Sequence, residues 1–417
     1  MAANRRQVIK TMSAAPIVAA VPAGALLGGT PAEAEPVQHA GALGGRDLFT
    51  EVGVEPLINA RGTMTYLSGN LMLPEVVNAI RATSHEFVNM YELQDAVGAK
   101  LAEMLDCEGA MVTAGAASAL AIGTAAVLTG TDEEKIKALP FLPGPRQEVV
   151  IQKSHRYVFD QNVRMAGVDF VEVDGPREME RAINKRTAMA LFFNGASSWY
   201  GTPDSVTHEQ FVEIAQRHKI PTFIDAAADV PPKERLFMYQ RMGFDLVTFS
   251  GGKIIRGPQS AGILLGRRDL IEAAKLNFNP YEAPIGRTMK VNKEEIFGMY
   301  AAIKSYLERD HDREWKDWQD RCQRIARSVE QVSSVEAKTV VPDGPANEFP
   351  GLEVTWDQDQ VAITPDEVIE RLRDGRPRIE VGGGGEVLAI SVVTLRKDQI
   401  PTVARRVRDL LAEASTR

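Results

Sequence analysis

The sequence has little cysteine, no long block of like charge and no long apolar run, and each absence excludes a class of protein. Its two cysteines, Cys107 and Cys322, are far apart and lie outside any CxxC or Cys/His cluster. A disulfide framework or a zinc site is therefore not expected, and two buried or half-buried thiols are the simpler interpretation. Like charges are not concentrated in blocks and the formal net charge is −8, so no nucleic-acid partner is expected.

The overall composition indicates an ordinary globular protein. Apolar residues make up 44% of the 417 residues and charged residues 25%. A chain of this length predicts two domains, or one large domain with an appendage. Neither an internal repeat nor a low-complexity tract is evident after the N-terminal segment.

The first 34 residues have the three-part layout of a secretory signal. Paired arginines, Arg5 and Arg6, precede an apolar run over 14–29, and Pro31–Ala34 reads as a small-x-small cleavage site. The arginine pair is typical of the twin-arginine route. A mitochondrial presequence or a membrane anchor is the alternative, although the run is short and interrupted by Gly and Pro. We expect the twin-arginine export machinery as a partner, cleavage near Ala34, a periplasmic location and no stable membrane anchor.

After the signal, we expect an arm with little structure over residues 35–55 and an extended entry segment over residues 57–65. Pro74 starts a helix whose apolar positions continue to Met90, and a second helix is expected over 95–105. A short strand over 110–113 then leads into small residues and a helix that continues to Leu128.

The turn before that helix consists of Gly115, Ala116 and Ala117. Small residues at a helix N-terminus let backbone N–H groups approach an anion, and the helix dipole favours that anion. These three residues therefore predict a phosphate cradle. The alternative is a tightly packed turn that binds nothing.

From residue 148 onward, strands alternate with helices. Buried strands end near His155, Asn194 and Asp225. This alternation predicts an α/β fold with a mostly parallel sheet sandwiched by helices. Because ligands of such sheets bind beyond the carboxyl ends of the strands, these three side chains are candidates for one site.

A single lysine, Lys253, lies in a glycine-rich loop between two apolar runs, 246–249 and 263–265. A lysine held between buried strands loses hydration, so its pKa falls and its neutral amine can attack an aldehyde. This chemistry is what a Schiff-base lysine for pyridoxal 5′-phosphate (PLP) requires. The alternative is a surface lysine in a hairpin turn.

The C-terminal part predicts a long helix from residue 292 to about residue 331, followed by a compact α+β domain. The expected organisation has four parts: a signal peptide over 1–34, an arm over 35–55, a large cofactor-binding domain over 56–290, and a connecting helix with a small domain over 291–417.

PLP also needs an acid at its ring nitrogen and a platform on its ring face. Asp225 is the candidate acid, with a helix N-cap as the alternative role. His155 is the candidate platform, and its alternative is a hydrogen-bonded turn residue. Asn194 is a candidate donor to the 3-oxygen of the ring, and the Ser250 hydroxyl would join the phosphate cradle.

These residues occur in an order that resembles the fold-type I PLP enzymes. The lysine segment 250–262, Ser-Gly-Gly-Lys-Ile-Ile-Arg-Gly-Pro-Gln-Ser-Ala-Gly, and the entry segment 57–65 are similar to the selenocysteine synthase (L-seryl-tRNA(Sec) selenium transferase) branch. That branch includes proteins like D-glucosaminate-6-phosphate ammonia-lyase. The resemblance implies an aminotransferase-like fold, PLP as cofactor, and catalytic roles for Lys253 and Asp225.

The resemblance also implies a homodimer or higher homo-oligomer, with Gln259 near the phosphate region of a neighbouring subunit. It places Arg396 where this fold often holds a substrate carboxylate, although a surface arginine is the alternative. Arg61 and Arg287 are further candidates for binding an anionic group of the substrate. No metal site is expected.

The resulting hypothesis is a PLP-dependent lyase or transferase that acts on an amino acid or amino sugar acid. Elimination at the β-carbon is the first choice, because the arm and signal stand where the selenium transferase carries a tRNA-binding domain. Selenium-transferase-like activity, racemisation and transamination are the alternatives. A non-catalytic binding protein on the same fold is the alternative from another class.

Overall fold

The computed structural model describes residues 42–43 and 46–415, and two compact units divide the chain between Pro56 and Leu57. The expected signal peptide lies outside the described residues. The first unit contains β1 (Ala42–Leu43) paired with β2 (Arg46–Asp47), and helix α2 (Leu48–Val52). The Asp47 carboxylate caps α2 by accepting from the Phe49 N–H at 3.1 Å. The described part of the arm, which the sequence predicts to have little structure, thus contains two short strands and one capped helical turn.

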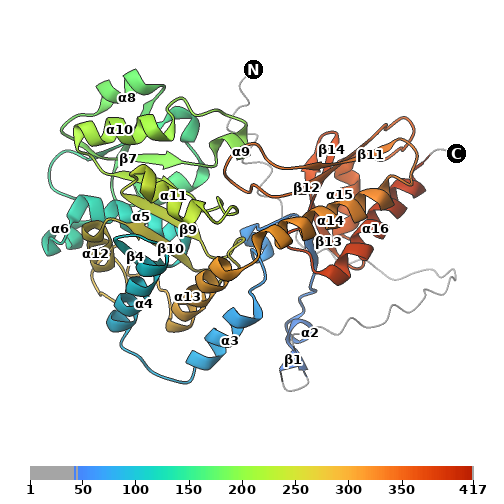
Figure 1. The fold of residues 1–417 in the computed structure, drawn as a ribbon, viewed down its shortest axis with the longest axis horizontal. Helices are drawn as coiled ribbons and strands as arrows, with labels where there is room; N and C mark the ends of the chain where they lie inside the picture. The colour runs from blue at the N-terminus through green and yellow to red at the C-terminus, as the bar shows by residue number, and fades with distance from the viewer. Residues whose placement is uncertain (1–41, 44–45, 416–417) are drawn as a thin grey trace, which may run out of the picture. The chain divides into compact units, whose positions relative to one another are not determined.

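The second unit is built around a seven-stranded sheet with the order β4-β10-β9-β8-β7-β5-β6 (Figure 1). Its strands are β4 (Gly109–Thr113), β5 (Glu148–Gln152), β6 (Asp169–Val173), β7 (Thr187–Phe193), β8 (Thr222–Asp225), β9 (Leu246–Ser250) and β10 (Gly262–Gly266). Strand β10 pairs antiparallel with both β9 and β4, whereas β6, β5, β7, β8 and β9 pair in parallel. The predicted mostly parallel sheet is confirmed.

Helices cover both faces of this sheet. All residues of β5, β8 and β10 are buried, and successive side chains of a strand point to opposite faces. The helices of this part are α4 (Met90–Met104), α5 (Gly115–Thr129), α6 (Glu133–Ala138), α7 (Gln161–Arg164), α8 (Pro176–Ala182), α9 (Ala196–Tyr200), α10 (His208–His218), α11 (Arg235–Met242) and α12 (Arg268–Leu276). Helix α5 is buried nearly all round and contacts five strands of the sheet.

A second, five-stranded sheet lies in the C-terminal part and has the order β11-β12-β14-β13-β3. Its strands are β3 (Ile58–Ala60), β11 (Val335–Val340), β12 (Gly351–Trp356), β13 (Ile379–Gly384) and β14 (Val387–Ser391). Helices α14 (His311–Val329) and α15 (Pro365–Arg373) pack against it, and α16 (Ile400–Glu413) packs against these two helices. The predicted small α+β region is confirmed, and the entry segment joins it because β3 pairs in parallel with β13.

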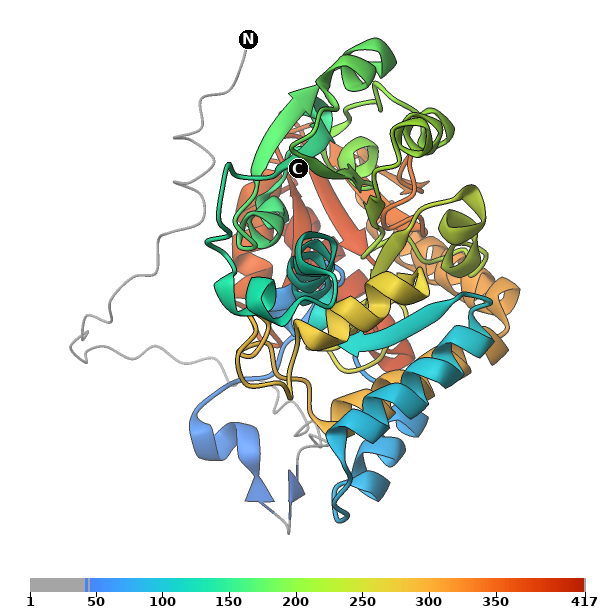
Figure 2. The same cartoon turned by 90° about the vertical axis from the view of Figure 1, so that its left-hand side faces the viewer.

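Two expected helices have different limits in the structure. Helix α3 (Pro74–Thr83) ends well before Met90, and Phe87 and Val88 lie outside it with exposed side chains. The expected long helix is two helices, α13 (Lys293–Glu308) and α14, because Arg309 is extended and the Asp310 carboxylate caps α14 at the Arg313 N–H. Helices α3, α4 and α13 pack side by side (Figures 1 and 2).

Short 3₁₀ turns connect several of these elements: η1 (Thr65–Leu67), η2 (Lys153–His155), η3 (Val158–Asp160) and η4 (Lys397–Gln399). Across the described part of the chain, every helix is too short or too polar to cross a bilayer.

Candidate active site

The carboxyl ends of β4, β8 and β9 meet at one edge of the large sheet. Ser250, the last residue of β9, pairs with Gly262, which in turn pairs with Thr113 at the end of β4. Asp225 at the end of β8 pairs with Thr248 of β9. The segment 251–261, called the lysine loop below, leaves the sheet at this edge, as expected from the apolar runs that flank it.

Lys253 is held in the lysine loop by backbone hydrogen bonds. The Gly251 N–H donates to the Ala261 carbonyl at 2.9 Å, and the Gly257 N–H donates to the Gly251 carbonyl at 2.8 Å. The Lys253 Nζ lies 5.4 Å from the centre of the Trp199 ring. Burial lowers the pKa of Lys253, while the Asp225 and Asp229 carboxylates act in the opposite direction. The arrangement therefore raises the fraction of neutral, nucleophilic amine.

Asp225 is buried beside this lysine, and both of its oxygens accept hydrogen bonds. Oδ2 accepts from the Tyr157 hydroxyl, and Oδ1 accepts from the Ala227 N–H at 3.1 Å. Burial raises the pKa of Asp225, whereas the two hydrogen bonds and Lys253 lower it. Tyr157 was not predicted as a site residue. The signal available in the sequence was a phenol two residues after the strand-end histidine.

His155 is completely buried and both of its ring nitrogens are engaged. Nδ1 accepts from the Phe193 N–H at 3.1 Å, so Nε2 carries the proton that faces Asp204 at 2.8 Å. The edge of a second aromatic ring, Phe192, packs against it with ring centres 4.5 Å apart. The geometry therefore favours the hydrogen-bonded turn residue, the alternative left open above, over the expected ring platform.

Asn194 is also fully engaged, within a buried polar network. Its Nδ2 donates to Asp229 Oδ2 at 2.5 Å and contacts the Tyr239 hydroxyl at 2.5 Å. Its Oδ1 accepts from His208 Nε2 at 2.6 Å. Burial raises the pKa of Asp229 to about 6. Both N–H groups of Asn194 are therefore engaged in the network, so Asn194 has no donor left for the expected contact with the 3-oxygen of PLP.

The N-terminus of α5 has the features of an anion site. No side chain caps it, Gly115 has φ +79°, and the N–H groups of the first turn have no partners within the helix. The Ser118 hydroxyl, one turn further on, is buried without a hydrogen-bond partner. Helix side chains tilt toward the N-terminus, so this hydroxyl lies over the first turn. These donors fit a phosphate group.

The start of β10 abuts this turn. A Cβ at Gly262 would lie 2.7 Å from the Gly115 carbonyl carbon and 2.8 Å from the Ala116 nitrogen, so only glycine fits there. The Ser250 side chain is half-buried at the end of β9, on the same edge. Gln259 is exposed on the lysine loop and packs against Gly69. A Cβ built on Gly69 would lie 3.0 Å from the Cγ of Gln259.

The three candidate substrate arginines lie on different elements, and the described structure records no contact between them. Arg61 is exposed after β3, and its guanidinium lies 5.9 Å from the centre of the Tyr66 ring. Arg287 is half-buried in the connection between α12 and α13. Arg396 is exposed and forms an ion pair with Asp398 at 3.2 Å. That pairing favours the surface role that the sequence left open for Arg396.

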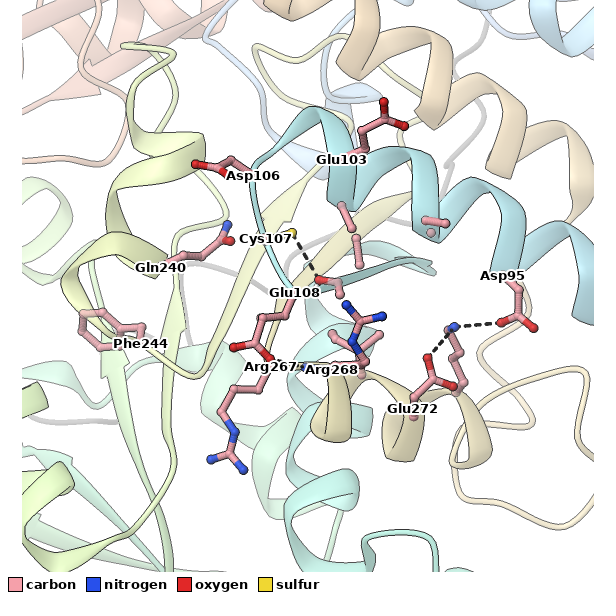
Figure 3. Close-up of a pocket in the computed structure, with 18 of the residues that line it drawn as sticks. Asp95, Glu103, Asp106, Cys107, Glu108, Gln240, Phe244, Arg267, Arg268 and Glu272 are labelled. Atoms are coloured by element: carbon pink, nitrogen blue, oxygen red, sulfur yellow. Dashed lines mark hydrogen bonds and ion pairs between the residues drawn. The ribbon is translucent and has the colours of Figure 1, made fainter.

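A cavity of about 900 Å³ lies at the opposite edge of the large sheet (Figure 3). It is lined by the first residue of β4, Gly109, and the last residue of β10. Several of its charged side chains pair with one another: Lys275 Nζ lies 2.7 Å from Asp95 and 3.0 Å from Glu272, and Arg241 pairs with Asp106 at 3.2 Å. Burial raises the pKa of the Cys107 thiol to about 11, so it is a poor nucleophile. These features do not favour this cavity as the active site.

Comparison with known proteins adds the family. The family model described as L-seryl-tRNA selenium transferase matches residues 57–316. The chain belongs to this family. The resemblance drawn from the lysine loop is therefore confirmed, and the protein is an enzyme of a PLP-dependent family.

Two relatives match over most of their lengths. The chain is 28% identical over 379 residues to the 5′-C-glycyluridine monooxygenase-decarboxylase of Streptomyces sp, covering 88% of this chain and 92% of that protein. It is 25% identical over 383 residues to the D-glucosaminate-6-phosphate ammonia lyase of Salmonella typhimurium, covering 88% and 99%. The solved structure of D-glucosaminate-6-phosphate ammonia-lyase shares the fold, with a TM-score of 0.77 at 24% identity over 88% of this chain and 99% of that one.

Proposed function

We propose that this family member binds PLP and acts on a small amino substrate, an amino acid or amino sugar acid. One observation carries the proposal: a lysine with a lowered pKa, a buried carboxylate and an uncapped helix N-terminus lie at the same edge of one sheet. Each group matches one requirement of PLP, namely the bond to its aldehyde, the contact with its ring nitrogen and the binding of its phosphate.

The chain's own residues then have separate tasks. The first-turn amides of α5, with the Ser118 hydroxyl, hold the phosphate. Asp225 fixes the ring by accepting the N–H of its nitrogen. When bound, PLP supplies an electron sink for the pair left at the substrate α-carbon. The Lys253 amine removes the α-proton as general base, a task that its lowered pKa favours near neutral pH.

Elimination at the β-carbon with release of ammonia is our first choice for the reaction. The match to a protein named ammonia lyase over 99% of its length supports this choice. A second candidate is decarboxylation with oxygen, which the 28% identical relative named monooxygenase-decarboxylase favours. Racemisation, transamination and selenium transfer remain alternatives, and a binding protein without activity is the alternative from another class.

The first test is the visible absorption spectrum of the purified protein beside Lys253→Ala. We expect the wild type, but not the variant, to bind PLP with a visible band that borohydride abolishes. Lys275→Ala, which removes a lysine at the opposite edge of the sheet, is the matched control and should keep the band. A wild type that ignores added PLP would overturn the proposal.

A product screen then separates the reactions. Elimination releases ammonia and a keto product without consuming oxygen, whereas the second candidate consumes oxygen and releases carbon dioxide. Amino acids and amino sugar acids are offered to the holoenzyme while ammonia, oxygen and carbon dioxide are followed together. Turnover of none of them, in a protein that binds PLP, would favour the binding-protein alternative.

We also propose that the protein is a homodimer or larger homo-oligomer. Large apolar side chains between residues 64 and 91 are exposed in the single chain, and Phe87 is 102% exposed. The exposed members are Met64, Tyr66, Leu71, Met72, Val77, Phe87, Val88 and Tyr91. Such a concentration is typical of a surface that another chain covers. Light scattering during gel filtration tests this, and a monomeric mass would contradict it.

Finally, we propose export by the twin-arginine route to the periplasm, with cleavage near Ala34. The paired arginines and the small-x-small site support this proposal. N-terminal sequencing of the protein recovered from the periplasm tests it. A mature chain that still begins at Met1 would contradict it.

A further inference from the structure

Tyr157 is a residue of the site to which the proposed function gives no task. It lies between η2 and η3, just beyond β5, and is 6% exposed. Its ring stacks on Phe193 at the end of β7, with ring centres 3.8 Å apart and planes at 10°. A stacked, buried phenol of this kind has its hydroxyl held in one direction.

That direction is toward Asp225. The Tyr157 hydroxyl donates to Asp225 Oδ2, while the Ala227 N–H holds Oδ1 at 3.1 Å. A carboxylate oxygen accepts more than one hydrogen bond, so Asp225 keeps capacity for another donor. Burial and the neighbouring carboxylate raise the pKa of Tyr157, so its hydroxyl keeps the proton that it donates to Asp225.

The hydrogen bond opposes the effect of burial on Asp225. Burial favours the protonated carboxylic acid, which is a much weaker acceptor for the N–H of a pyridinium ring than the carboxylate is. The bond from Tyr157 favours the carboxylate and lowers the pKa of Asp225. Where a proton is shared between a ring nitrogen and Asp225, a less basic carboxylate leaves that proton closer to the nitrogen.

We propose that Tyr157 is a positioning residue for Asp225: its hydroxyl orients the carboxylate and keeps the shared proton on the ring nitrogen of PLP. The inference rests on the proposed function, because it concerns the same site. The alternative is that Tyr157 only packs against Phe193. Tyr157→Phe separates the two, since it keeps the stacked ring and removes the hydroxyl.

The chain offers a matched control pair next to this one. Tyr239 donates to Asp229 Oδ2 at 2.7 Å, and both residues are buried, with Tyr239 at 1% exposure. Tyr239→Phe therefore removes a hydroxyl of the same kind from a neighbouring carboxylate, but leaves the bond to Asp225 in place. It controls for the general cost of losing a buried phenol hydroxyl.

The experiment loads wild type, Tyr157→Phe and Tyr239→Phe with PLP labelled with ¹⁵N in its ring. The ¹⁵N resonance reports where the shared proton lies, and a titration gives the PLP dissociation constant. We expect Tyr157→Phe to move the resonance toward that of a neutral pyridine and to weaken PLP binding about tenfold. Tyr239→Phe should leave the resonance at the wild-type position.

A second variant keeps the test decisive if Tyr157→Phe fails to fold. A fluorinated tyrosine placed at position 157 keeps the shape and is a stronger donor, so it should move the resonance in the opposite direction. An unchanged resonance in these Tyr157 variants, or an equal change in Tyr239→Phe, would overturn the inference while the proposed function stands. Failure of the wild type to bind PLP would instead overturn the proposed function.

Discussion

Asp229 is a buried carboxylate whose protonation couples the fold to pH. It is 1% exposed, and burial raises its pKa from the ordinary value of 3.8 to about 6. The folded chain thus binds this proton more tightly than the unfolded chain does. Its contribution to the free energy of unfolding is full below about pH 4 and is lost as the pH rises toward 6. A shift of this size corresponds to about 3 kcal/mol.

We therefore expect Asp229→Asn to become more stable, relative to the wild type, as the pH rises. The asparagine oxygen can still accept from Asn194 and Tyr239, but the side chain no longer ionises. Between pH 4 and pH 7, the difference in unfolding free energy should move in favour of the variant by about 2–3 kcal/mol. Equilibrium urea unfolding of the PLP-free proteins measures this difference.

Asp320→Asn is the control, because Asp320 is exposed on α14. Its difference from the wild type should stay within about 0.5 kcal/mol across the same range. A pH-independent difference for Asp229→Asn would mean that Asp229 titrates near its ordinary value in the folded protein.

The sequence could predict a site residue only where its position at the end of a strand is enough to place it in the site. Apolar runs place Lys253 and Asp225 at the same edge of the sheet, and the structure has them there. The roles of His155 and Asn194 depend on how their side chains turn after the strand. That direction is set by partners distant in sequence, Asp204 and Asp229, which periodicity does not reveal.

At the scale of elements, α5 carries a further prediction. Its Ser118 hydroxyl is buried without a partner, which costs stability while no anion is bound. Ser118→Ala should therefore stabilise the PLP-free protein by about 1 kcal/mol and weaken PLP binding several-fold. Thermal unfolding without PLP and a PLP titration measure the two effects.

Thr124→Ser is the matched control on the same helix. The Thr124 hydroxyl donates to the Leu120 carbonyl at 2.7 Å, so this change keeps its hydrogen bond and lies away from the first turn. It should leave PLP affinity unchanged. An unchanged PLP affinity in Ser118→Ala would mean that the hydroxyl has no part in the phosphate site.

The limits of elements were harder to predict than their existence. The apolar pattern of 292–331 continues through Arg309 and Asp310, because both helices bury one stripe. Helix α13 ends because the backbone of Arg309 is extended and the Asp310 carboxylate caps α14. Hydrophobic periodicity does not detect such a break, because it depends on a local hydrogen bond between a side chain and the backbone. The segment that contains β3 was correctly predicted to be extended. Its pairing with β13 could not be predicted, because the two strands are far apart in the sequence.

At the scale of the second unit, a connection between β11 and β12 ties the small sheet to the active-site edge of the large one. Within this connection, residues 341–350, the Asn347 N–H donates to the Ala228 carbonyl at 2.8 Å and the Ala346 N–H to Ser198 Oγ at 3.1 Å. Ala228 is three residues from Asp225, and Ser198 adjoins Trp199, which faces Lys253. The connection therefore bonds to the two segments that carry Asp225 and Trp199.

Arg235 joins the two parts at this point. Its Nη1 donates to the carbonyls of Asp229 at 3.0 Å and Pro345 at 2.9 Å, and its Nη2 pairs with Glu348. We expect Arg235→Ala to lower the free energy of unfolding by about 2–4 kcal/mol, because several half-buried carbonyls and a carboxylate lose their donor together. Hydrogen exchange should also speed up at residues 342–350 and 228–232.

Arg235→Lys should recover little of this loss, since an ammonium group cannot reach the same acceptors as the planar fork of arginine. Arg241→Ala on the same helix is the control. Arg241 pairs with Asp106 at 3.2 Å where both side chains are largely exposed, so its loss should cost under about 1 kcal/mol. If hydrogen exchange at 342–350 is unchanged in Arg235→Ala, backbone bonds alone hold the connection, and the small sheet then supports the lysine without this arginine.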